Sequence, residues 1–230
     1  MEKKNSFFDT KKMVGIATFS ALAFVATLMT SWITVAGFLS LDAKDAIITI
    51  AAFVYGPISA VIISVITALI EFFTISFSTT GWYGLIMNIA SSATFSLVAS
   101  LIYSKKRDIN GAIIGFCSAV IATTGVMILL NIFVTPFYLV WKFGMLIEVA
   151  RGEVMSMLPI TLMPFNLMKS LMNSAIAMLL YKPTITALAR ARLIDAKGTK
   201  TGFNRNSVII TIAGVVCIVA AVAIYFIVLK

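Results

Sequence analysis

Residues 158–181 read LPITLMPFNLMKSLMNSAIAMLLY, and this stretch decides the fold class. It is apolar and long enough to cross a bilayer as a helix, yet Pro164, Asn166 and Lys169 lie near its middle. A cation at that depth costs at least about 3 kcal/mol, and such residues normally face a protein interior or a wet cavity. We therefore expect Lys169 to contact a ligand or to form a buried ion pair.

The whole chain has the composition of a polytopic membrane protein. It contains 60% hydrophobic and 12% charged residues and has a mean hydropathy of +1.04, which is too apolar for a soluble domain of its length. The apolar runs are continuous and do not alternate, so they predict helices and not a barrel. The first run is too long for a cleavable signal. The chain has no histidine and no Cys-x-x-Cys, so we expect no metal and no thiol redox site.

These features predict an all-α integral membrane fold in three parts. Residues 1–188 form a six-helix substrate-binding bundle, residues 189–206 a basic cytoplasmic linker, and residues 207–230 an extra seventh apolar helix. Gly56–Pro57 predicts a tight reversal after a short second segment, because proline cannot continue a helical ladder. Residues 141–157 are predicted to be a polar loop. The six helices of the bundle are expected over residues 13–36, 46–55, 58–75, 84–103, 111–139 and 158–181.

The distribution of Lys and Arg predicts the orientation of the chain. With the N-terminus in the cytoplasm and alternating spans, thirteen of the 18 basic residues lie on the inner side, four lie outside and Lys169 lies within the membrane. The positive-inside rule therefore favours a cytoplasmic N-terminus, and the net charge of +9 requires no nucleic acid. The four outer cations are Lys44, Lys142, Arg151 and Lys230.

This orientation brings scattered polar residues to a similar depth. At 1.5 Å per residue, Glu71 lies about 6 Å and Asn88 about 9 Å below the outer surface. Asn131 and Asn166 lie about 12 Å down, and Lys169 about 16 Å. Burying such polar groups in a membrane costs free energy, and here they lie on four helices at a similar depth. Together they predict a binding site in the outer half of the bilayer that opens outward.

Other interpretations of these residues remain open. An isolated Asn such as Asn88 can simply bond a neighbouring helix, and Glu71 can lie near headgroups or pair with a loop cation. Ala17 and Ala21 on the first helix form a small-xxx-small pair, which suits packing within the chain as well as a partner helix. The chain contains no G-x-x-x-x-G-K-[S/T] loop, so any energy for transport is expected to come from a partner.

A series of short motifs in the same order resembles a known transporter family. They are Leu39-x-x-Asp42, Tyr55-Gly-Pro57, Gly84-x-x-x-Asn88, Leu130-Asn131 followed by Pro136, and Pro164-Phe-Asn166-x-x-Lys169. Together they resemble the riboflavin-specific substrate-binding subunit, or S component, of bacterial energy-coupling-factor (ECF) vitamin transporters. The resemblance covers about residues 13–188. The P-F-N-x-x-K motif with the Asn of the fifth helix is the most specific part of it.

The resemblance implies a membrane subunit of the bacterial cell membrane that binds riboflavin from outside, and it leaves open whether FMN is also bound. It implies partnership with a transmembrane coupling subunit and two cytoplasmic ATP-binding subunits, and no ATPase of its own. The only small molecule implied is riboflavin as the transported ligand, with no cofactor. Ala17 and Ala21 correspond to the docking face for the coupling subunit. The implied substrate-binding residues are Leu41, Asp42, Gly81, Gly84, Asn88, Asn131, Asn166 and Lys169.

Two departures from the family pattern leave alternatives open. Residues 43–47 read AKDAI where relatives have a Ser-Asp-x-Pro-like run, and the segment after residue 182 exceeds the usual six helices. The first alternative is an S component for another vitamin, such as pantothenate, folate or a pyridoxine-like compound. A membrane enzyme or assembly factor would need paired carboxylates or a nucleophile–base set near one interface, and the sequence offers none.

Overall fold

The structure of the chain is a computed structural model that describes residues 10–31, 34–35, 39–107 and 109–190, together with residues 212, 216, 219 and 223. Helices dominate the described chain, and a short antiparallel hairpin, β1 with β2, joins the first two of them. In order, the elements are α1 (Thr10–Thr30), β1 (Thr34–Val35), β2 (Leu39–Ser40), α2 (Lys44–Tyr55), α3 (Pro57–Glu71), η1 (Phe72–Ser76), α4 (Gly81–Lys105), α5 (Ile109–Phe143), α6 (Ile147–Met157), η2 (Leu158–Leu162) and α7 (Met163–Arg190).

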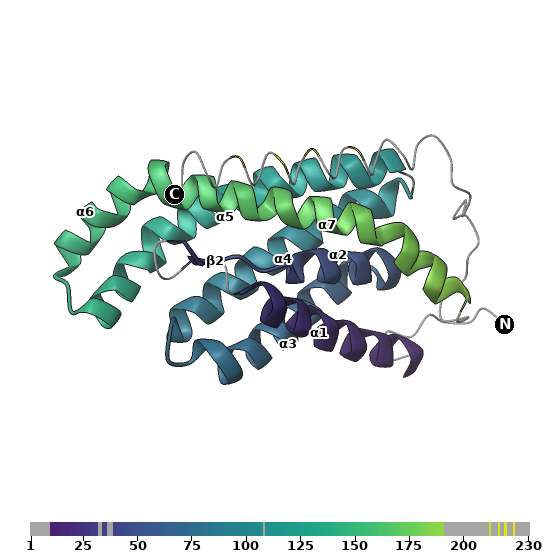
Figure 1. Cartoon of the computed structure of the whole chain (residues 1–230), viewed down its shortest axis with the longest axis horizontal. Helices are drawn as coiled ribbons and strands as arrows, with labels where there is room; N and C mark the ends of the chain where they lie inside the picture. The colour runs from purple at the N-terminus through teal and green to yellow at the C-terminus, as the bar shows by residue number, and fades with distance from the viewer. Residues whose placement is uncertain are drawn as a thin grey trace.

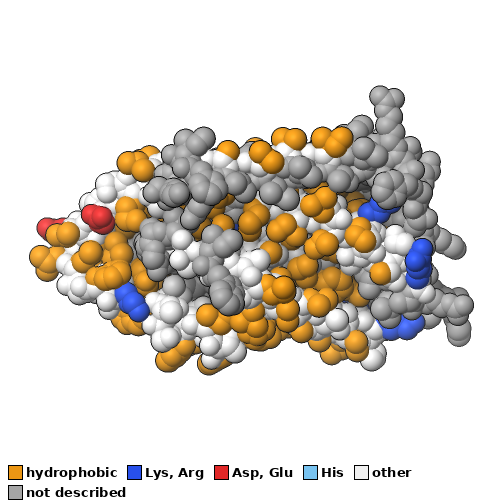
Figure 2. All heavy atoms as spheres, viewed as in Figure 1, with side chains coloured by type: hydrophobic (Ala, Val, Ile, Leu, Met, Phe, Trp, Pro, Cys, Tyr) orange, Lys and Arg blue, Asp and Glu red, His pale blue; other side chains and the backbone are white. Residues whose placement is uncertain are grey.

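The helices lie roughly along one long axis, with α1 and α3 on one side, α5 and α7 on the other, and α6 at one end (Figure 1). Four segments of the described chain are long and apolar enough to cross a membrane: Thr10–Thr30, Pro57–Ser76, Gly81–Lys105 and Asn110–Phe143. Hydrophobic side chains cover the middle of the face in Figure 2, and most Lys and Arg side chains in view gather at one end. The chain is therefore a multi-pass, all-α membrane protein, as its composition predicts.

The short helix α2 is the central element of the bundle. It has only 12 residues, too few to cross a bilayer, and most of them are buried. It packs against α1, α3, α4 and α7. Near its C-terminal end, Phe53 stacks on Tyr103 with ring centroids 4.1 Å apart and contacts Phe116 of α5. This packing places the first turn of α2, with its charged residues, inside the protein.

The reversal predicted at Gly56–Pro57 is present. Gly56 has φ +96° and ψ 166°, a region open almost only to glycine, and Pro57 begins α3 where its missing N–H needs no helical partner. Because no atom of the described residues, apart from its chain neighbours, lies within 4 Å of a Cβ placed on Gly56, the requirement for glycine is one of backbone conformation and not of space.

The first helix ends earlier than predicted. The sequence predicted a helix to residue 36, but α1 stops at Thr30 and the chain turns into the hairpin of β1 and β2. Thr34 and Val35 are β-branched and favour a strand. The Thr30 hydroxyl also accepts a hydrogen bond from the Ala43 amide at 3.1 Å, which returns the chain to the bundle.

Residues 141–157 are not a polar loop as predicted. Residues 141–143 continue α5, and α6 occupies Ile147–Met157. Ala150 and Val154 are buried and four residues apart, so they form one apolar face, while Glu148, Arg151 and Glu153 are exposed. These charged residues interrupt the short apolar face of the helix, so the sequence pattern predicted a loop.

The last described helix begins and ends later than predicted. Residues 158–162 form a π-helical turn, η2, which contains Pro159 and is followed by Pro164 in the first turn of α7; both prolines lack the N–H donor of a regular helix. The helix α7 then continues through Pro183 to Arg190 instead of ending at residue 181. The predicted linker 189–206 lies outside the described residues beyond Arg190, and so does the predicted helix 207–230 apart from four single positions. Both remain predictions.

We expect Gly56→Ala to lower the free energy of unfolding by about 1–3 kcal/mol, because alanine does not readily adopt the backbone conformation of this residue. Thermal unfolding in detergent measures the loss. Gly152→Ala in α6 is the matched control: its backbone is helical, and outside the neighbouring helix backbone no atom of the described residues lies within 4 Å of the added Cβ, so stability should stay equal or rise. Equal losses in the two variants would contradict this account of the reversal.

Candidate functional site

Charged side chains lie inside the bundle around the first turn of α2. Asp42, Lys44 and Asp45 are each no more than 2% exposed, because the loop 41–43 and α2 are enclosed by α1, α3, α4 and α7. The sequence interpretation counted Lys44 among the outer loop cations, and this was wrong. A buried charge needs partners, since leaving one unpaired costs on the order of several kcal/mol.

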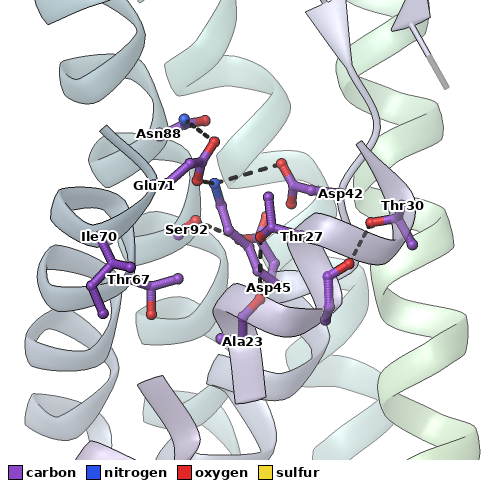
Figure 3. Close-up of polar contacts among 12 residues, drawn as sticks. Ala23, Thr27, Thr30, Asp42, Asp45, Thr67, Ile70, Glu71, Asn88 and Ser92 are labelled. Carbon is purple, nitrogen blue, oxygen red and sulfur yellow. Dashed lines mark hydrogen bonds and ion pairs between the residues drawn. The ribbon is translucent and has the colours of Figure 1, made fainter. Parts of the chain in front are cut away.

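Two ion pairs compensate these charges. The Lys169 ammonium of α7 lies 2.7 Å from Asp42 Oδ2, and Lys44 Nζ lies 2.5 Å from Glu71 Oε2 of α3. Lys44 Nζ is also 3.6 Å from Asp42 Oδ2, so the two pairs form one continuous network. In Figure 3, Glu71 and Asp42 lie on opposite sides of the cluster. Lys169 therefore forms a buried ion pair, one of the two roles that the sequence predicted for it, and its partner is Asp42.

Neutral side chains complete the network. Asn88 of α4 donates to Glu71 Oε1 at 2.9 Å, and Ser92, one turn further along α4, donates to Asp45 Oδ1 at 2.5 Å (Figure 3). Asn173 of α7 donates to the Asp42 carbonyl at 2.8 Å and accepts the Ala46 amide at 2.9 Å. These bonds fix the 42–46 segment against both α4 and α7.

The network retains unused hydrogen-bonding capacity. Asp42 Oδ1 is buried and has no partner in the described structure, although most buried polar atoms are bonded. Lys169 has three N–H donors, and Asp42 is the one acceptor that they have among the described residues. A buried acceptor and spare donors side by side suit a ligand that both donates and accepts. Within the described residues, no group of His, Cys, Asp or Glu side chains is arranged to hold a metal ion.

The charge state of Asp42 follows from its neighbours. Asp42 lies in the loop between β2 and α2, outside the membrane-spanning helices. Burial alone would raise the pKa of this carboxyl, but Lys169 and Lys44 together hold its pKa below the usual range. Asp42 is therefore an anion that pairs with both lysines inside the bundle.

Asn131 and Asn166 are buried, but neither bonds to the network. Asn131 donates to the Met127 carbonyl of its own helix at 2.7 Å and accepts the Thr135 hydroxyl at 2.9 Å. Asn166 donates to the Leu162 carbonyl at 2.7 Å. Each amide nitrogen keeps a second N–H that these bonds do not use. The binding role predicted for both residues is untested and remains a prediction.

The remaining predicted residues surround the network or lie away from it. Leu41 is buried against Phe165 and Met168 of α7. Gly81 begins α4 with φ +59°, and a Cβ there would lie 3.0 Å from the Trp141 ring; at Gly84 it would meet the Thr80 side chain. Ala17 and Ala21 are exposed on α1, so they are accessible to a partner helix.

A groove of about 340 Å³ opens elsewhere, between α5 and α6. None of the predicted binding residues lines it, so it is separate from the charged network. Its lining residues are Ile132, Phe133, Pro136, Phe137, Arg151, Val154 and Met155.

Sequence reasoning missed several members of the network. Lys44 and Asp45 follow Asp42 in a short polar stretch that reads as a turn, and Ser92 is an ordinary residue in a membrane helix. Asn173 had a usable signal, because it follows Lys169 by four residues and therefore shares its face of the helix. For Glu71 the sequence left pairing with a loop cation as one alternative, and the structure identifies that cation as Lys44.

Comparison with known proteins is consistent with this architecture. The family described as "ECF transporter, substrate-specific component" matches residues 11–181. The chain is 29% identical over 192 residues to the riboflavin transporter RibU of Staphylococcus aureus (strain TCH60), covering 82% of this chain and 97% of the relative. It also resembles a solved S component of a bacterial ECF transporter, with a TM-score of 0.61 and 29% identity over 78% of this chain and 98% of that one.

We expect Lys44→Met to lower the free energy of unfolding by about 3–5 kcal/mol, because it leaves Glu71 buried without its cation. Glu71→Met should also destabilise the protein, whereas the double variant should lose less than the sum of the two. Thermal or denaturant unfolding of the ligand-free protein in detergent closes this double-mutant cycle. Strictly additive losses would mean that the two side chains do not interact.

Proposed function

The chain belongs to the family of substrate-specific components of ECF transporters, and from this premise we propose that it captures riboflavin from outside the cell and delivers it inward. The relative named riboflavin transporter RibU supports riboflavin as the ligand, since this chain matches 97% of its length. The observation that carries the proposal is the buried network with an unpaired Asp42 Oδ1 and spare Lys169 donors.

Riboflavin suits the chemistry of this site. Its ring system carries an N–H group and carbonyl oxygens along one edge, and its ribityl chain carries hydroxyls, so it both donates and accepts. Lys169 would donate to the ligand while Asp42 holds the ammonium in place, and the free N–H groups of Asn131 and Asn166 would reach the same ligand. Leu41, Asn88, Gly81 and Gly84 would line the pocket, and the apolar Phe165 and Met168 beside Leu41 suit the flat ring.

The energy for uptake would come from partners. We propose that a transmembrane coupling subunit and two cytoplasmic ATP-binding subunits complete the transporter, and that this chain has no ATPase of its own. Ala17 and Ala21 would form the docking face, because small exposed residues on a membrane helix allow close approach of another helix.

The same proposal includes an orientation in the bacterial cell membrane. The N-terminus would be cytoplasmic, together with the basic end seen in Figure 2, and the polar network would lie nearer the outer surface. Residues 189–206 would then be a cytoplasmic linker that leads to a seventh apolar helix over residues 207–230.

We expect purified protein to bind riboflavin, measured as quenching of flavin fluorescence in a titration. Lys169→Met, Asn131→Ala and Asn166→Ala should each weaken binding by at least about 1–2 kcal/mol, because each removes a buried hydrogen bond to the ligand. Lys142→Met, at an exposed lysine that donates to the Ser78 carbonyl, is the matched control and should bind normally. Normal riboflavin binding in all three site variants would place the site elsewhere. If the protein binds pantothenate, folate or a pyridoxine-like compound and not riboflavin, its ligand is a different vitamin.

We expect Ala17→Phe or Ala21→Phe to reduce riboflavin uptake by cells while leaving riboflavin binding by the purified subunit unchanged. The bulky ring would block approach of the coupling subunit without touching the polar network. Ile121→Phe, at a position of α5 that is 75% exposed, controls for added bulk on a lipid-facing surface. Equal losses of binding and uptake would indicate misfolding instead of lost docking.

A further inference from the structure

The groove between α5 and α6 lies apart from the charged network and has no role in the proposed function. Its volume of about 340 Å³ is in the range of small-molecule pockets, which are mostly apolar with a few placed polar groups. Ile132, Phe133 and Phe137 of α5 form one wall, and Val154 and Met155 of α6 form the other. Phe133 is 68% exposed and Phe137 50%, so the groove is open to the surroundings of the bundle.

The groove faces the lipid of the membrane. One wall belongs to a segment that is long and apolar enough to cross a bilayer, Asn110–Phe143. The α6 helix lies at the end of the bundle opposite to that where most Lys and Arg side chains in view gather (Figures 1 and 2). Trp82 and Trp141 near this end are both exposed, and exposed tryptophans are typical of the level of lipid headgroups. The groove therefore opens where acyl chains meet headgroups.

Arg151 gives the groove a positive charge. It is the charged residue among those that line the groove, and Glu148 and Glu153 of the same helix do not line it. Arg151 is exposed and forms no ion pair with any other described residue. A guanidinium presents a rigid fork of N–H donors that matches the oxygens of a phosphate. The groove thus combines apolar walls with one side chain suited to an anion.

Pro136 adds an acceptor to the α5 wall. It lies inside the helix and has no N–H, so the carbonyl of Ile132, four residues earlier, lacks its regular helical donor. Both residues line the groove. A carbonyl freed in this way inside a membrane is satisfied by a donor from elsewhere, and a ligand hydroxyl is one such donor.

We propose that this groove binds phosphatidylglycerol, a phospholipid with an anionic headgroup, through its phosphate on Arg151 and one acyl chain along the apolar walls. Charge complementarity selects this class, because the lining carries one positive charge and the lipid one negative charge. A zwitterionic lipid with the same chains has no net charge, and diacylglycerol has no phosphate for the guanidinium. The glycerol hydroxyls of the headgroup also suit the Ile132 carbonyl.

The test titrates the purified full-length chain in detergent with three lipids that share the same oleoyl chains. These are phosphatidylglycerol, phosphatidylcholine and diacylglycerol, and native mass spectrometry measures the bound fraction of each. Wild type should bind phosphatidylglycerol about fivefold or more tightly than either of the others, because only this lipid brings a net negative charge to the guanidinium.

Three variants assign the preference to the groove. Arg151→Met should bring the affinity for phosphatidylglycerol down to that for phosphatidylcholine. Lys142→Met is the matched control, because it removes an exposed cation near the same end that does not line the groove, and it should keep the wild-type preference. Met155→Trp keeps Arg151 but fills the groove, so it should weaken phosphatidylglycerol binding about fivefold or more. Arg151 and Met155 are both exposed, so these variants should fold.

Three results would overturn the inference. Wild type could bind phosphatidylglycerol and phosphatidylcholine equally, or Arg151→Met could keep the preference, and either result would show that the guanidinium does not select the lipid. Undiminished binding in Met155→Trp would show that the acyl chain does not lie in the groove. Displacement of the lipid by an equal concentration of inorganic phosphate would identify a site for small anions instead. The proposed function stands or falls separately, on riboflavin binding.

Discussion

Two buried ion pairs, Lys169 with Asp42 and Lys44 with Glu71, hold the centre of this membrane protein together. Removing an ion from water costs on the order of several kcal/mol, so each of these charges is tolerable only beside its partner. The pairs connect α7 and α3 through the loop and first turn of α2. A polar stretch that would otherwise remain at the surface is thereby held inside the bundle.

The position of α2 links this electrostatic constraint to the proposed function. The helix is too short to span a bilayer, and its apolar C-terminal half packs against Phe95, Phe116 and Tyr103 while its first turn carries the charges. Asn173 and Thr30 fix the backbone on either side of Lys44. The Lys169 donors and the free oxygen of Asp42 are thus preorganised, and a ligand that binds them does not have to order them first.

Much of the fold and part of the site could be predicted from local sequence. Hydropathy and length identified the four described segments that are long and apolar enough to cross a membrane, but α2 and α7, also predicted as bundle helices, are not among them. Gly56–Pro57 identified the reversal, and the depth of Lys169 indicated a functional or paired cation. The α6 helix was missed because only Ala150 and Val154 mark its buried face among charged residues. Lys44 was misassigned because a short run of Asp and Lys has the same composition whether it is a solvated turn or a buried helix start.

The sequence by itself therefore determined the membrane class, the order of the membrane-spanning helices and the presence of a costly cation in the last described helix. These follow from composition and periodicity, which act over neighbouring residues. The identity of each charge's partner was decided only by the tertiary structure. Asp42 and Lys169 are separated by 127 positions in the chain, and no local pattern indicates which carboxylate the packing of α2 brings to that ammonium.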